Sequence, residues 1–376
     1  MKIGFDAKRA IKNNTGLGNY SRYVIEVLSD FFPDYLYVLF APEKKNNPRL
    51  GKLLSCKSVF FVFPSGIAKL FSSIWRIWRI NLDLKKQEIA IFHGLSNELP
   101  FGIKKTGIKS VVTIHDLIFL RYPGYYKPID RFIYRLKFKH ACEKADKIIA
   151  ISECTKRDIV SFFHISPEKI AVIYQGCDPS FSQLATEEKK REVKKNYSLP
   201  PSYILYVGSI EERKNLLLVV KAMQYVDEHI HLVAVGKRTA YQKQIEQFLS
   251  NNSISSRIHI FNHFPFEDLP ALYQMAKIFV YPSFFEGFGI PVIEALSSGV
   301  PVVAATGSCL EEAGGPDSMY ADPTDEKAWA EKITSILSNL DLSQSMADEG
   351  LKYVERFQKK VIAQDIMQIY DEIRQG

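Results

Sequence analysis

The feature of this sequence that most constrains its fold is an alternation of short apolar runs with longer amphipathic stretches. The apolar runs are rich in β-branched and aromatic residues, which favour strands, whereas the stretches between them have the periodicity of helices. Such an alternation is typical of βαβ units, which form parallel sheets covered by helices. The sequence therefore predicts an α/β protein.

The alternation occurs in two series. The first series predicts helices that include 19–31 and 128–145, and strands at residues 2–6, 35–40, 58–63, 89–93, 110–115, 147–151 and 170–173. The second series predicts a helix from Leu216, two C-terminal helices within 343–374, and strands at residues 203–208, 230–236, 258–261, 278–281 and 300–304. Between the series, the highly charged stretch 186–197 leads to a Pro-Pro pair and is interpreted as a linker or an exposed helix.

At 376 residues, the chain is longer than one hydrophobic core usually serves. Together with the two series of elements, this length predicts two doubly wound, Rossmann-like domains that face each other. In open α/β sheets, ligands bind outside the carboxyl ends of the strands. We therefore expect the loops of both domains to line one cleft.

Charge and cysteine content limit the class of protein. Residues 1–150 contain 26 Lys and Arg against 12 Asp and Glu, a balance of +14, and the remaining residues contain 23 against 30, a balance of −7. A uniformly basic protein is thereby excluded. The five cysteines never form a C-x2-C pair, which argues against a disulfide framework or a zinc knuckle and favours a reduced, cytoplasmic protein. No stretch reaches about eighteen apolar residues without a charge, so we predict neither a membrane span nor a signal peptide.

A Gly-Leu-Gly loop precedes the first long helix, with Gly16 and Gly18 two residues apart. Glycines at a helix N-terminus let backbone N–H groups approach an anion closely. A nicotinamide-binding fingerprint would need a third Gly or Ala where Ser21 stands, and a first Gly close behind the strand, whereas Ala7–Thr15 intervene here. The loop is interpreted either as a phosphate contact or as a flexible start of the helix.

A second motif follows the first strand of the second series. Gly208 and Ser209 are followed by Arg213 and Lys214, directly before a helix. A guanidinium group and an ammonium group suit a diphosphate, the first by its fork geometry and the second as a point charge. Cations at a helix N-terminus oppose the helix dipole, so a bound anion explains this placement better than a solvated run of charges does.

The third motif is the most specific. A strand ends at Tyr281, and a loop with two glycines leads to a helix that begins near Pro291. Glu286 in the loop and Glu294 in the helix lie eight residues apart in mostly apolar surroundings. Carboxylates placed in this way accept hydrogen bonds from hydroxyl groups, which sugars and riboses carry. Alternatively, Glu294 caps a neighbouring helix and Glu286 forms an ion pair between the two domains.

Two histidines end predicted strands of the first series. Asn97 lies four residues after His93, and Asp116 directly follows His115. A lone histidine is more often structural than catalytic, but a position at the carboxyl end of a strand and beside an Asp favours a functional role. The two histidines could also bind a metal, but no third ligand has metal-site spacing.

The motifs, and the order in which they follow one another along the chain, resemble those of the retaining GT-B glycosyltransferases of family 4. The resemblance covers nearly the whole chain and rests on the segments 16–18, 112–116, 150–153, 173–178, 207–215 and 284–294. It implies a first Rossmann-like domain, 1–183, for the acceptor and a second, 184–356, for a nucleotide-sugar donor. It also implies that a C-terminal helix, 357–376, crosses back to the first domain.

The resemblance also implies roles for single residues. Arg213 and Lys214 would bind the diphosphate, Glu294 would hold the ribose, and Glu286 would hold sugar hydroxyls. His115 would contact the transferred sugar, so the predicted catalytic residues are His115, Arg213, Lys214 and Glu286. The other predicted donor contacts are Gly16, Gly18, Gly208, Ser209, Phe288, Gly289 and Ile290, and the predicted acceptor-side residues are His93, Asn97 and Asp116. One departure is that Thr15 stands before Gly16 where many relatives carry a second glycine.

The predicted chemistry follows from these roles. Departure of a nucleoside diphosphate develops negative charge, which Arg213 and Lys214 can neutralise without a metal. The first domain offers no obvious carboxylate nucleophile, so the resemblance implies front-face transfer with retention, in which the leaving phosphate helps to deprotonate the acceptor hydroxyl. We therefore expect a UDP- or GDP-sugar donor, no cofactor and no metal.

Two stretches of the basic half, 71–80 and 122–140, interleave basic and aromatic residues. Such stretches either lie in the interface of an anionic membrane or form ordinary amphipathic helices whose basic ends reach water. We expect a glycan acceptor, lipid-linked, and a cytoplasmic protein held peripherally at the inner membrane face.

Two other functions fit parts of the sequence. Nucleic-acid binding would use the basic half, but no recognised motif gathers the bases, and the C-terminal motifs would have no role. A nucleotide-sugar epimerase or a phosphorylase could use the same two-domain scaffold, because a fold does not fix a function. A phosphorylase would need a pyridoxal lysine, for which the sequence has no motif.

Overall fold

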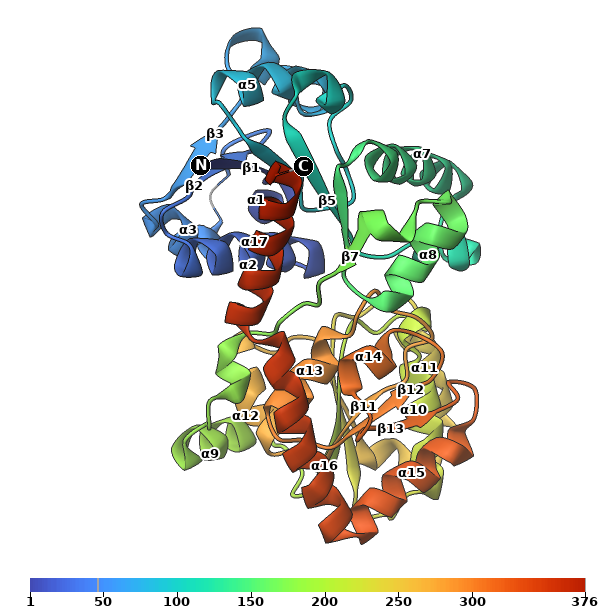
Figure 1. Cartoon of the computed structure of the whole chain (residues 1–376). Coiled ribbons are helices and arrows are strands. Elements are labelled where there is room, and N and C mark those ends of the chain that lie inside the picture. The colour runs from blue at the N-terminus through green and yellow to red at the C-terminus, as the bar shows by residue number, and fades with distance from the viewer. Residues whose placement is uncertain (46, 376) are drawn as a thin grey trace. The chain divides into compact units, whose positions relative to one another are not determined.

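In the computed structural model, which describes residues 1–45 and 47–375, the chain folds into two compact α/β units. The first unit comprises Met1–Gln175 and the C-terminal segment from Gln358, and the second comprises Gly176–Phe357. Each unit is built on a parallel sheet with helices packed against it (Figure 1). The predicted α/β class with two Rossmann-like domains is confirmed.

The described strands of the first sheet follow the order β3-β2-β1-β4-β5-β6-β7. They are β1 (Lys2–Asp6), β2 (Leu36–Phe40), β3 (Val59–Val62), β4 (Ile91–Gly94), β5 (Lys109–Ile114), β6 (Lys147–Ala150) and β7 (Ile170–Val172). The chain runs outward from β1 to β3 and then returns to place β4 on the other side of β1. The connections after β1 and β4 therefore diverge, and such a switch point is where α/β sheets bind ligands.

Helices of the first unit join these strands and include one formed by the C-terminal segment. They are α1 (Lys8–Lys12), α2 (Gly16–Phe31), α3 (Gly51–Ser55), α4 (Ser72–Ile74), the π-helix η3 (Trp75–Arg79), α5 (Ile80–Lys86), the short η4 (Ile103–Thr106), α6 (Ile118–Arg121), α7 (Pro128–Lys144), α8 (Glu153–Phe163) and α17 (Lys359–Gln375). Helix α17 packs against α2, as Figure 1 shows, and buries Ile366 and Tyr370 completely. The last helix is therefore part of the core of the first unit.

The second sheet repeats the same plan. Its described strands follow the order β10-β9-β8-β11-β12-β13, so β8 and β11 form its switch point. They are β8 (Tyr203–Val207), β9 (His231–Val235), β10 (Ile258–Phe261), β11 (Ile278–Tyr281), β12 (Val302–Ala305) and β13 (Met319–Ala321). Strand β13 is absent from the sequence prediction, because three residues are too few to show a period.

The second unit is also rich in helices. They are α9 (Glu187–Asn196), the short η8 (Glu212–Lys214), α10 (Leu216–Ala222), α11 (Gln242–Ser250), α12 (Leu269–Gln274), α13 (Ile290–Ser297), α14 (Leu310–Gly314), α15 (Glu326–Ser338) and α16 (Leu340–Tyr353). The charged stretch before Pro200 is a helix, α9, whose Val193 is buried while its charged residues face solvent. Of the two readings of this stretch, the exposed helix is correct.

The strands are apolar because both faces of a parallel sheet are covered by helices. All four residues of β11 and of β12 are buried, as are the first four of β8. Polar groups are therefore concentrated in the loops after the strands, where they can meet a ligand.

The boundary between the units lies eight residues earlier than the sequence prediction of 183, at Gln175. Residues after it pack on the second unit: the Sγ atom of Cys177 lies 3.4 Å from Oγ of Ser297, and Phe181 packs edge-on against Tyr273 at 5.3 Å. The second boundary lies after Phe357 rather than after 356, because that ring packs against Phe288 at 5.4 Å. Side-chain contacts of this kind cannot be read from composition.

Candidate functional site

The second unit gathers its predicted donor-binding residues at the carboxyl ends of β8 and β11. Gly208 directly follows β8, and the turn η8 carries Arg213 and Lys214. Glu286 lies in the loop after β11. Because β8 and β11 are neighbours at the switch point, these two loops emerge side by side.

Arg213, Lys214 and Glu286 form one ion-paired group. The Oε2 atom of Glu286 lies 3.0 Å from Nη1 of Arg213, and its Oε1 atom lies 3.1 Å from Nζ of Lys214. Each of the three side chains is only 13 to 17% exposed. The structure thus brings together three of the four predicted catalytic residues, in a group that is largely shielded from water.

Two residues that the sequence analysis did not select complete this group. The hydroxyl of Tyr281 accepts a hydrogen bond from Lys214 at 2.6 Å and donates one to Oε1 of Glu286 at 3.2 Å. Ser283 donates a further hydrogen bond to the same oxygen at 2.8 Å. Burial raises the pKa of Glu286, but Lys214 and Arg213 outweigh burial and hold it at about 2. Glu286 is therefore a carboxylate at neutral pH and can accept hydrogen bonds from hydroxyl groups.

Both cations of the group are held in place by further contacts. Arg213 donates from Nη2 to Glu211 at 2.8 Å and from Nη1 to the carbonyl oxygen of Phe285. Lys214 uses two of the three donors of its ammonium group, on Tyr281 and on Glu286. Fixed cations of this kind can stabilise an anionic ligand without first having to reorganise.

Gly208 and Ser209 lie against the same group. A Cβ atom at Gly208 would come within 3.3 Å of the Lys214 side chain and 3.2 Å of the Tyr206 hydroxyl. The carbonyl oxygen of Ser209 accepts a hydrogen bond from that hydroxyl at 3.1 Å. A side chain at residue 208 would therefore press on Lys214, which would have to shift by a few tenths of an ångström.

The predicted donor contacts Phe288 and Gly289 directly precede α13, and Ile290 begins it. Gly289 has φ +132°, a value that side chains disfavour, and a Cβ atom there would come within 2.9 Å of Leu310. Phe288 is buried, and its carbonyl oxygen accepts a hydrogen bond from the thiol of Cys309 at 2.8 Å. Ile290 is the first residue of the helix, where N–H groups have no acceptor within the helix.

Glu294 lies one turn into α13 and belongs to a separate polar contact. Its Oε2 atom accepts a hydrogen bond from Tyr273 at 3.0 Å. Burial raises the pKa of Glu294 to about 7, assisted by Asp178 and opposed by the Tyr273 hydrogen bond. Within residues 1–45 and 47–375, no hydrogen bond or ion pair links Glu294 to Glu286, so the two predicted acceptors occupy different environments.

In the first unit, the two glycines of the early loop differ in their surroundings. A Cβ atom at Gly18 would lie 1.8 Å from the carbonyl oxygen of Asn13, whereas a Cβ atom at Gly16 would meet nothing within 4 Å. Gly18 is therefore needed for packing. Gly16, the first residue of α2, leaves open space in which a ligand could approach the backbone.

His115 directly follows β5 and is fixed by its neighbours. Its Nε2 atom lies 2.9 Å from the carbonyl oxygen of Leu95, and its backbone N–H donates to the side chain of Asn97 at 2.8 Å. Because a carbonyl can only accept, Nε2 carries the proton and Nδ1, which faces Gln175 at 3.5 Å, is the acceptor. Burial lowers the pKa of His115 to about 4, so the ring is neutral.

His93 is a correction to the sequence prediction, which assigned it to the acceptor side. The residue is completely buried, and its ring nitrogens lie 2.6 Å from the Tyr370 hydroxyl and 2.8 Å from Oγ1 of Thr113. Burial lowers its pKa to about 3. Because both ring nitrogens are buried and hydrogen-bonded within the protein, His93 cannot contact an acceptor substrate. It instead links α17 to the sheet.

Asn97 and Asp116, the other predicted acceptor-side residues, shape loops. Asn97 has φ +64° and uses its side-chain oxygen to accept from the backbone of His115. Asp116 accepts a hydrogen bond from the N–H of Ile118 at 3.1 Å, at the start of α6. Asn97 therefore positions His115, and Asp116 remains partly exposed beside it.

Tyr281, Ser283 and Tyr273 were not among the site residues predicted from the sequence. Tyr281 and Ser283 lie inside the quoted motif around Glu286, where a strand end followed by hydroxyl-bearing residues was the available signal. Tyr273 lies on α12, 21 residues before its partner Glu294, and no pattern in the sequence links the two.

Residues 1–45 and 47–375 contain no group of three His, Cys, Asp or Glu side chains that could hold a metal ion. In that same part of the chain, every helix is too short or too polar to cross a membrane.

Both units match known protein families. Residues 187–353 match the family described as glycosyl transferases group 1, and residues 16–181 match the one described as glycosyltransferase family 4. Together the two matches cover most of the chain and correspond closely to the second and first units.

Individual relatives are consistent with these matches. The chain is 30% identical over 272 residues to O-antigen chain mannosyltransferase B of Escherichia coli, covering 71% of this chain and 70% of the relative. It is 29% identical over 226 residues to O-antigen chain mannosyltransferase RfbU of Salmonella typhimurium, covering 60% of each. The solved structure of Anabaena Alr3699/HepE in complex with UDP and glucose has a similar fold, with a TM-score of 0.76, 16% identity and coverage of 99% and 100%.

Proposed function

Because the chain belongs to the group 1, family 4 glycosyltransferases, we propose that it transfers a hexose from a nucleotide-diphosphate sugar to a hydroxyl group of a glycan acceptor. The observation that carries this proposal is the group of Arg213, Lys214 and Glu286 at the switch point of the second sheet. Two relatives are named O-antigen mannosyltransferases, so mannose and bacterial surface polysaccharide are the first sugar and product to test.

The cations of the group suit the leaving nucleoside diphosphate. When the bond between the sugar carbon and the phosphate oxygen breaks, negative charge develops on the diphosphate. Arg213 and Lys214 are already held in place by several contacts and can neutralise that charge. The proposal therefore needs no metal, and we expect activity to persist in the presence of a chelator.

The two glutamates suit hydroxyl groups. Glu286 is ionised and lies beside the cations, where it can accept hydrogen bonds from the transferred sugar. Glu294 lies one turn into α13 and is assigned to the ribose. We assign the backbone around Gly208, Ser209, Phe288, Gly289 and Ile290 to further donor contacts.

The first unit is assigned to the sugar and the acceptor. Gly16 has the open space that a phosphate contact requires, and His115 is a neutral ring whose orientation Asn97 and Leu95 fix. We propose retention by front-face attack. The acceptor oxygen forms its bond to the sugar carbon as the phosphate leaves, and the proton of the acceptor hydroxyl passes to the departing phosphate.

Nucleotide binding and one variant test the proposal. GDP, UDP or one of their sugars at about 100 times its Kd should raise the free energy of unfolding by about 2.7 kcal/mol in a thermal-shift screen. Lys214→Ala should lower kcat/KM by about 100-fold or more, since it removes a fixed contact to the leaving group. Wild-type turnover in Lys214→Ala would contradict the role of this residue.

The same samples separate transfer from epimerisation. With a nucleotide-sugar and no acceptor, a transferase hydrolyses the donor slowly at most, whereas an epimerase converts it. Conversion to an epimer would refute the proposed reaction, and so would the absence of stabilisation by every nucleotide tried.

We further propose a lipid-linked acceptor, with the first unit bound to an anionic membrane at the cytoplasmic face. Helix α7 exposes an apolar stripe at helical spacing: Ile129, Phe132, Ile133 and Leu136, of which Ile129 is 73% and Phe132 64% exposed. Basic residues flank the stripe at Lys127, Arg131, Arg135 and Lys139. Exposed apolar and basic side chains together suit the headgroup region of an anionic bilayer.

A second exposed stripe lies nearby in the first unit. Leu70, Ile74, Trp78 and Leu82 recur at every fourth position, and all are more than half exposed. The rings of Trp78 and Phe101 stack at 5.2 Å, and Phe101 packs against His140 of α7 at 4.2 Å. These ring contacts join the two stripes.

Vesicle flotation tests the membrane proposal. At low salt the protein should float with phosphatidylglycerol vesicles and much less with phosphatidylcholine. Replacing both Phe132 and Leu136 by Ser should weaken binding about tenfold or more, because each loses burial of a large apolar side chain. Leu340→Ser, at a leucine of the second unit that is even more exposed than Phe132 and Leu136, is the control. Failure to bind anionic vesicles at low salt would refute the proposal.

A further inference from the structure

Asn215 directly follows the two cations of the candidate site and is only 8% exposed. It ends the turn η8 and precedes α10, with φ +57° and ψ +34°, in the left-handed region of backbone conformation. Asparagine adopts this conformation more readily than most residues other than glycine. A residue type that suits the left-handed region therefore stands where the turn that carries both cations ends.

The side-chain amide of Asn215 joins three loops at the carboxyl end of the second sheet. Its Nδ2 atom donates to the carbonyl oxygen of Pro323, after β13, at 2.7 Å and to that of Pro282, after β11, at 3.3 Å. Both partners are carbonyl oxygens, which only accept, so the NH2 group of the amide faces them. Asn215 itself lies in the loop after β8. One side chain thus connects this loop to two others.

A backbone hydrogen bond joins the loops after β8 and β11 beside this amide. The N–H of Phe284 donates to the carbonyl oxygen of Arg213 at 2.9 Å. This bond and the bond from Asn215 to Pro282 lie two residues apart on each loop. Two separate bonds fix the relative position of two loops, whereas one bond alone leaves them free to rotate about it. The position of the cations relative to Glu286 therefore depends on Asn215.

We propose that Asn215 is a positioning residue of the donor site. By tying the loop after β8 to the loops after β11 and β13, its amide holds the side chains of Arg213 and Lys214 where a diphosphate binds. Cations that are already in place need not reorganise when the ligand arrives, and a misplacement of about 1 Å can cost about 100-fold in rate. The inference rests on the proposed function and deepens it, because Asn215 acts through the two cations.

Calorimetric titration of the full chain tests this role with the variant Asn215→Gly. Glycine keeps the left-handed conformation and removes only the amide. The affinity for pyrophosphate, and for GDP or UDP, should fall about tenfold, as expected for the loss of the hydrogen bonds of one side chain. Guanosine and uridine carry no phosphate and should bind as they do to the wild type. The kcat of transfer should fall in the same variant, because the leaving group is less well stabilised.

A second variant and a matched control make the result specific. Asn215→Asp keeps the shape of the side chain, but a carboxylate cannot donate to carbonyl oxygens, so diphosphate affinity should fall at least as far. Asn252→Asp makes the same substitution where an amide donates to the carbonyl oxygen of Phe248 at 2.7 Å, before β10 and so at the opposite edge of the sheet. It should leave diphosphate binding unchanged. Asn215→Gly creates no buried charge and decides the outcome if Asn215→Asp unfolds.

Three results would overturn the inference: no binding of any diphosphate by the wild type, wild-type diphosphate affinity in Asn215→Gly, or an equal loss of affinity for nucleosides and diphosphates. The last result would show a general loosening of the second unit instead. Failure of the proposed function is recognised separately. A wild type that binds diphosphates but transfers no sugar would refute the transferase, while the affinities of the variants would still test the role of Asn215.

Discussion

The pKa values of two glutamates in one motif are shifted in opposite directions by their surroundings. Glu286 and Glu294 are both surrounded by apolar chain, and burial raises the pKa of each. Lys214 and Arg213 reverse this effect at Glu286 and hold its pKa at about 2. At Glu294 the Tyr273 hydrogen bond opposes burial only in part, and the pKa is raised to about 7. Their different pKa values therefore depend on the ion pairs that Glu286 makes with Arg213 and Lys214.

The raised pKa of Glu294 predicts a pH dependence of stability. The folded protein binds this proton more tightly than the unfolded chain, whose glutamate titrates near 4.5. The resulting stabilisation is fully present below about pH 4.5 and is lost as the pH rises through about 7. We expect Tm to fall less between about pH 5 and pH 8 in Glu294→Gln than in the wild type.

The matched control for this prediction is Glu331→Gln, at an exposed glutamate of α15. It should keep the pH profile of the wild type. Identical profiles for Glu294→Gln and the wild type would show that Glu294 does not titrate in this range.

At the scale of elements, the loop that leads into helix α2 serves both the packing of the chain and the approach of a ligand to the backbone. Arg22 of α2 donates hydrogen bonds to the carbonyl oxygens of Ala10 and Asn13, at 2.6 and 2.8 Å, and holds the preceding loop against the helix. Gly18 permits this close approach, and Gly16 leaves the end of the helix open. The two glycines therefore have different tasks.

This difference predicts a contrast between two alanine variants. Gly18→Ala places a methyl group against the carbonyl oxygen of Asn13 and should lower the free energy of unfolding by about 1–3 kcal/mol. Gly16→Ala should change it by less than about 0.5 kcal/mol, yet raise KM for the donor if phosphate approaches there. Urea unfolding and donor kinetics measure the two effects. Equal loss of stability in both variants would contradict the assignment.

At the scale of the whole molecule, the C-terminal segment completes a unit that begins at the other end of the chain. Helix α17 buries an apolar face in the first unit, and Tyr370 hydrogen-bonds to His93. Lys147 of β6 also lies 3.6 Å from Glu372. The first unit is therefore discontinuous in sequence, and it cannot be complete until the segment from Gln358 has been made.

Removing the segment from Gln358 should destabilise the first unit selectively. The deletion exposes the apolar groove that α17 covers, and hydrogen exchange should accelerate in β1, β2 and α2 more than in β8 and β11. Tyr370→Phe is the mild form of the same change. It leaves the nitrogen of His93 unpaired, which should cost about 1–3 kcal/mol. Unchanged exchange in the first unit after deletion would contradict this role of α17.

The α/β class, the two series of elements and the positions of the main motifs could be predicted from the sequence alone. These follow from local patterns, because strand and helix periods and the residues after a strand are visible along the chain. The group of Arg213, Lys214 and Glu286 was predictable for the same reason, since parallel strands bring their following loops to one edge.

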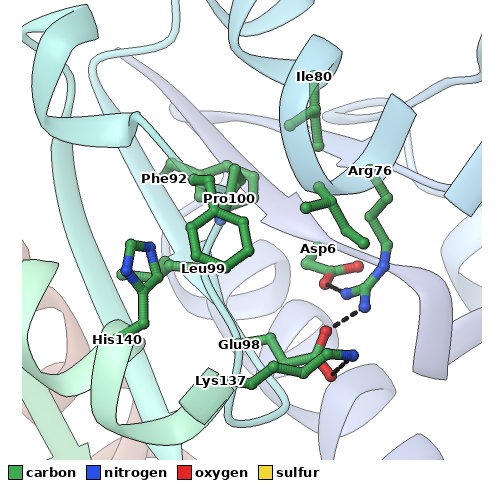
Figure 2. A pocket seen from close by; sticks show the side chains of 11 residues that line it. Asp6, Arg76, Ile80, Phe92, Glu98, Leu99, Pro100, Lys137 and His140 are labelled. Carbon is green, nitrogen blue, oxygen red and sulfur yellow. Dashed lines mark hydrogen bonds and ion pairs between the residues drawn. The ribbon is translucent and has the colours of Figure 1, made fainter. Parts of the chain in front are cut away.

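The contacts of the individual polar residues could be identified only in the folded protein. Folding made His93 a buried link to Tyr370, paired Glu294 with Tyr273, and placed the end of the first unit at Gln175. Folding also brought Asp6, Arg76 and Glu98 together from separate parts of the chain, as Figure 2 shows. Such contacts depend on distances between residues far apart in sequence, and a sequence pattern records only distances along the chain.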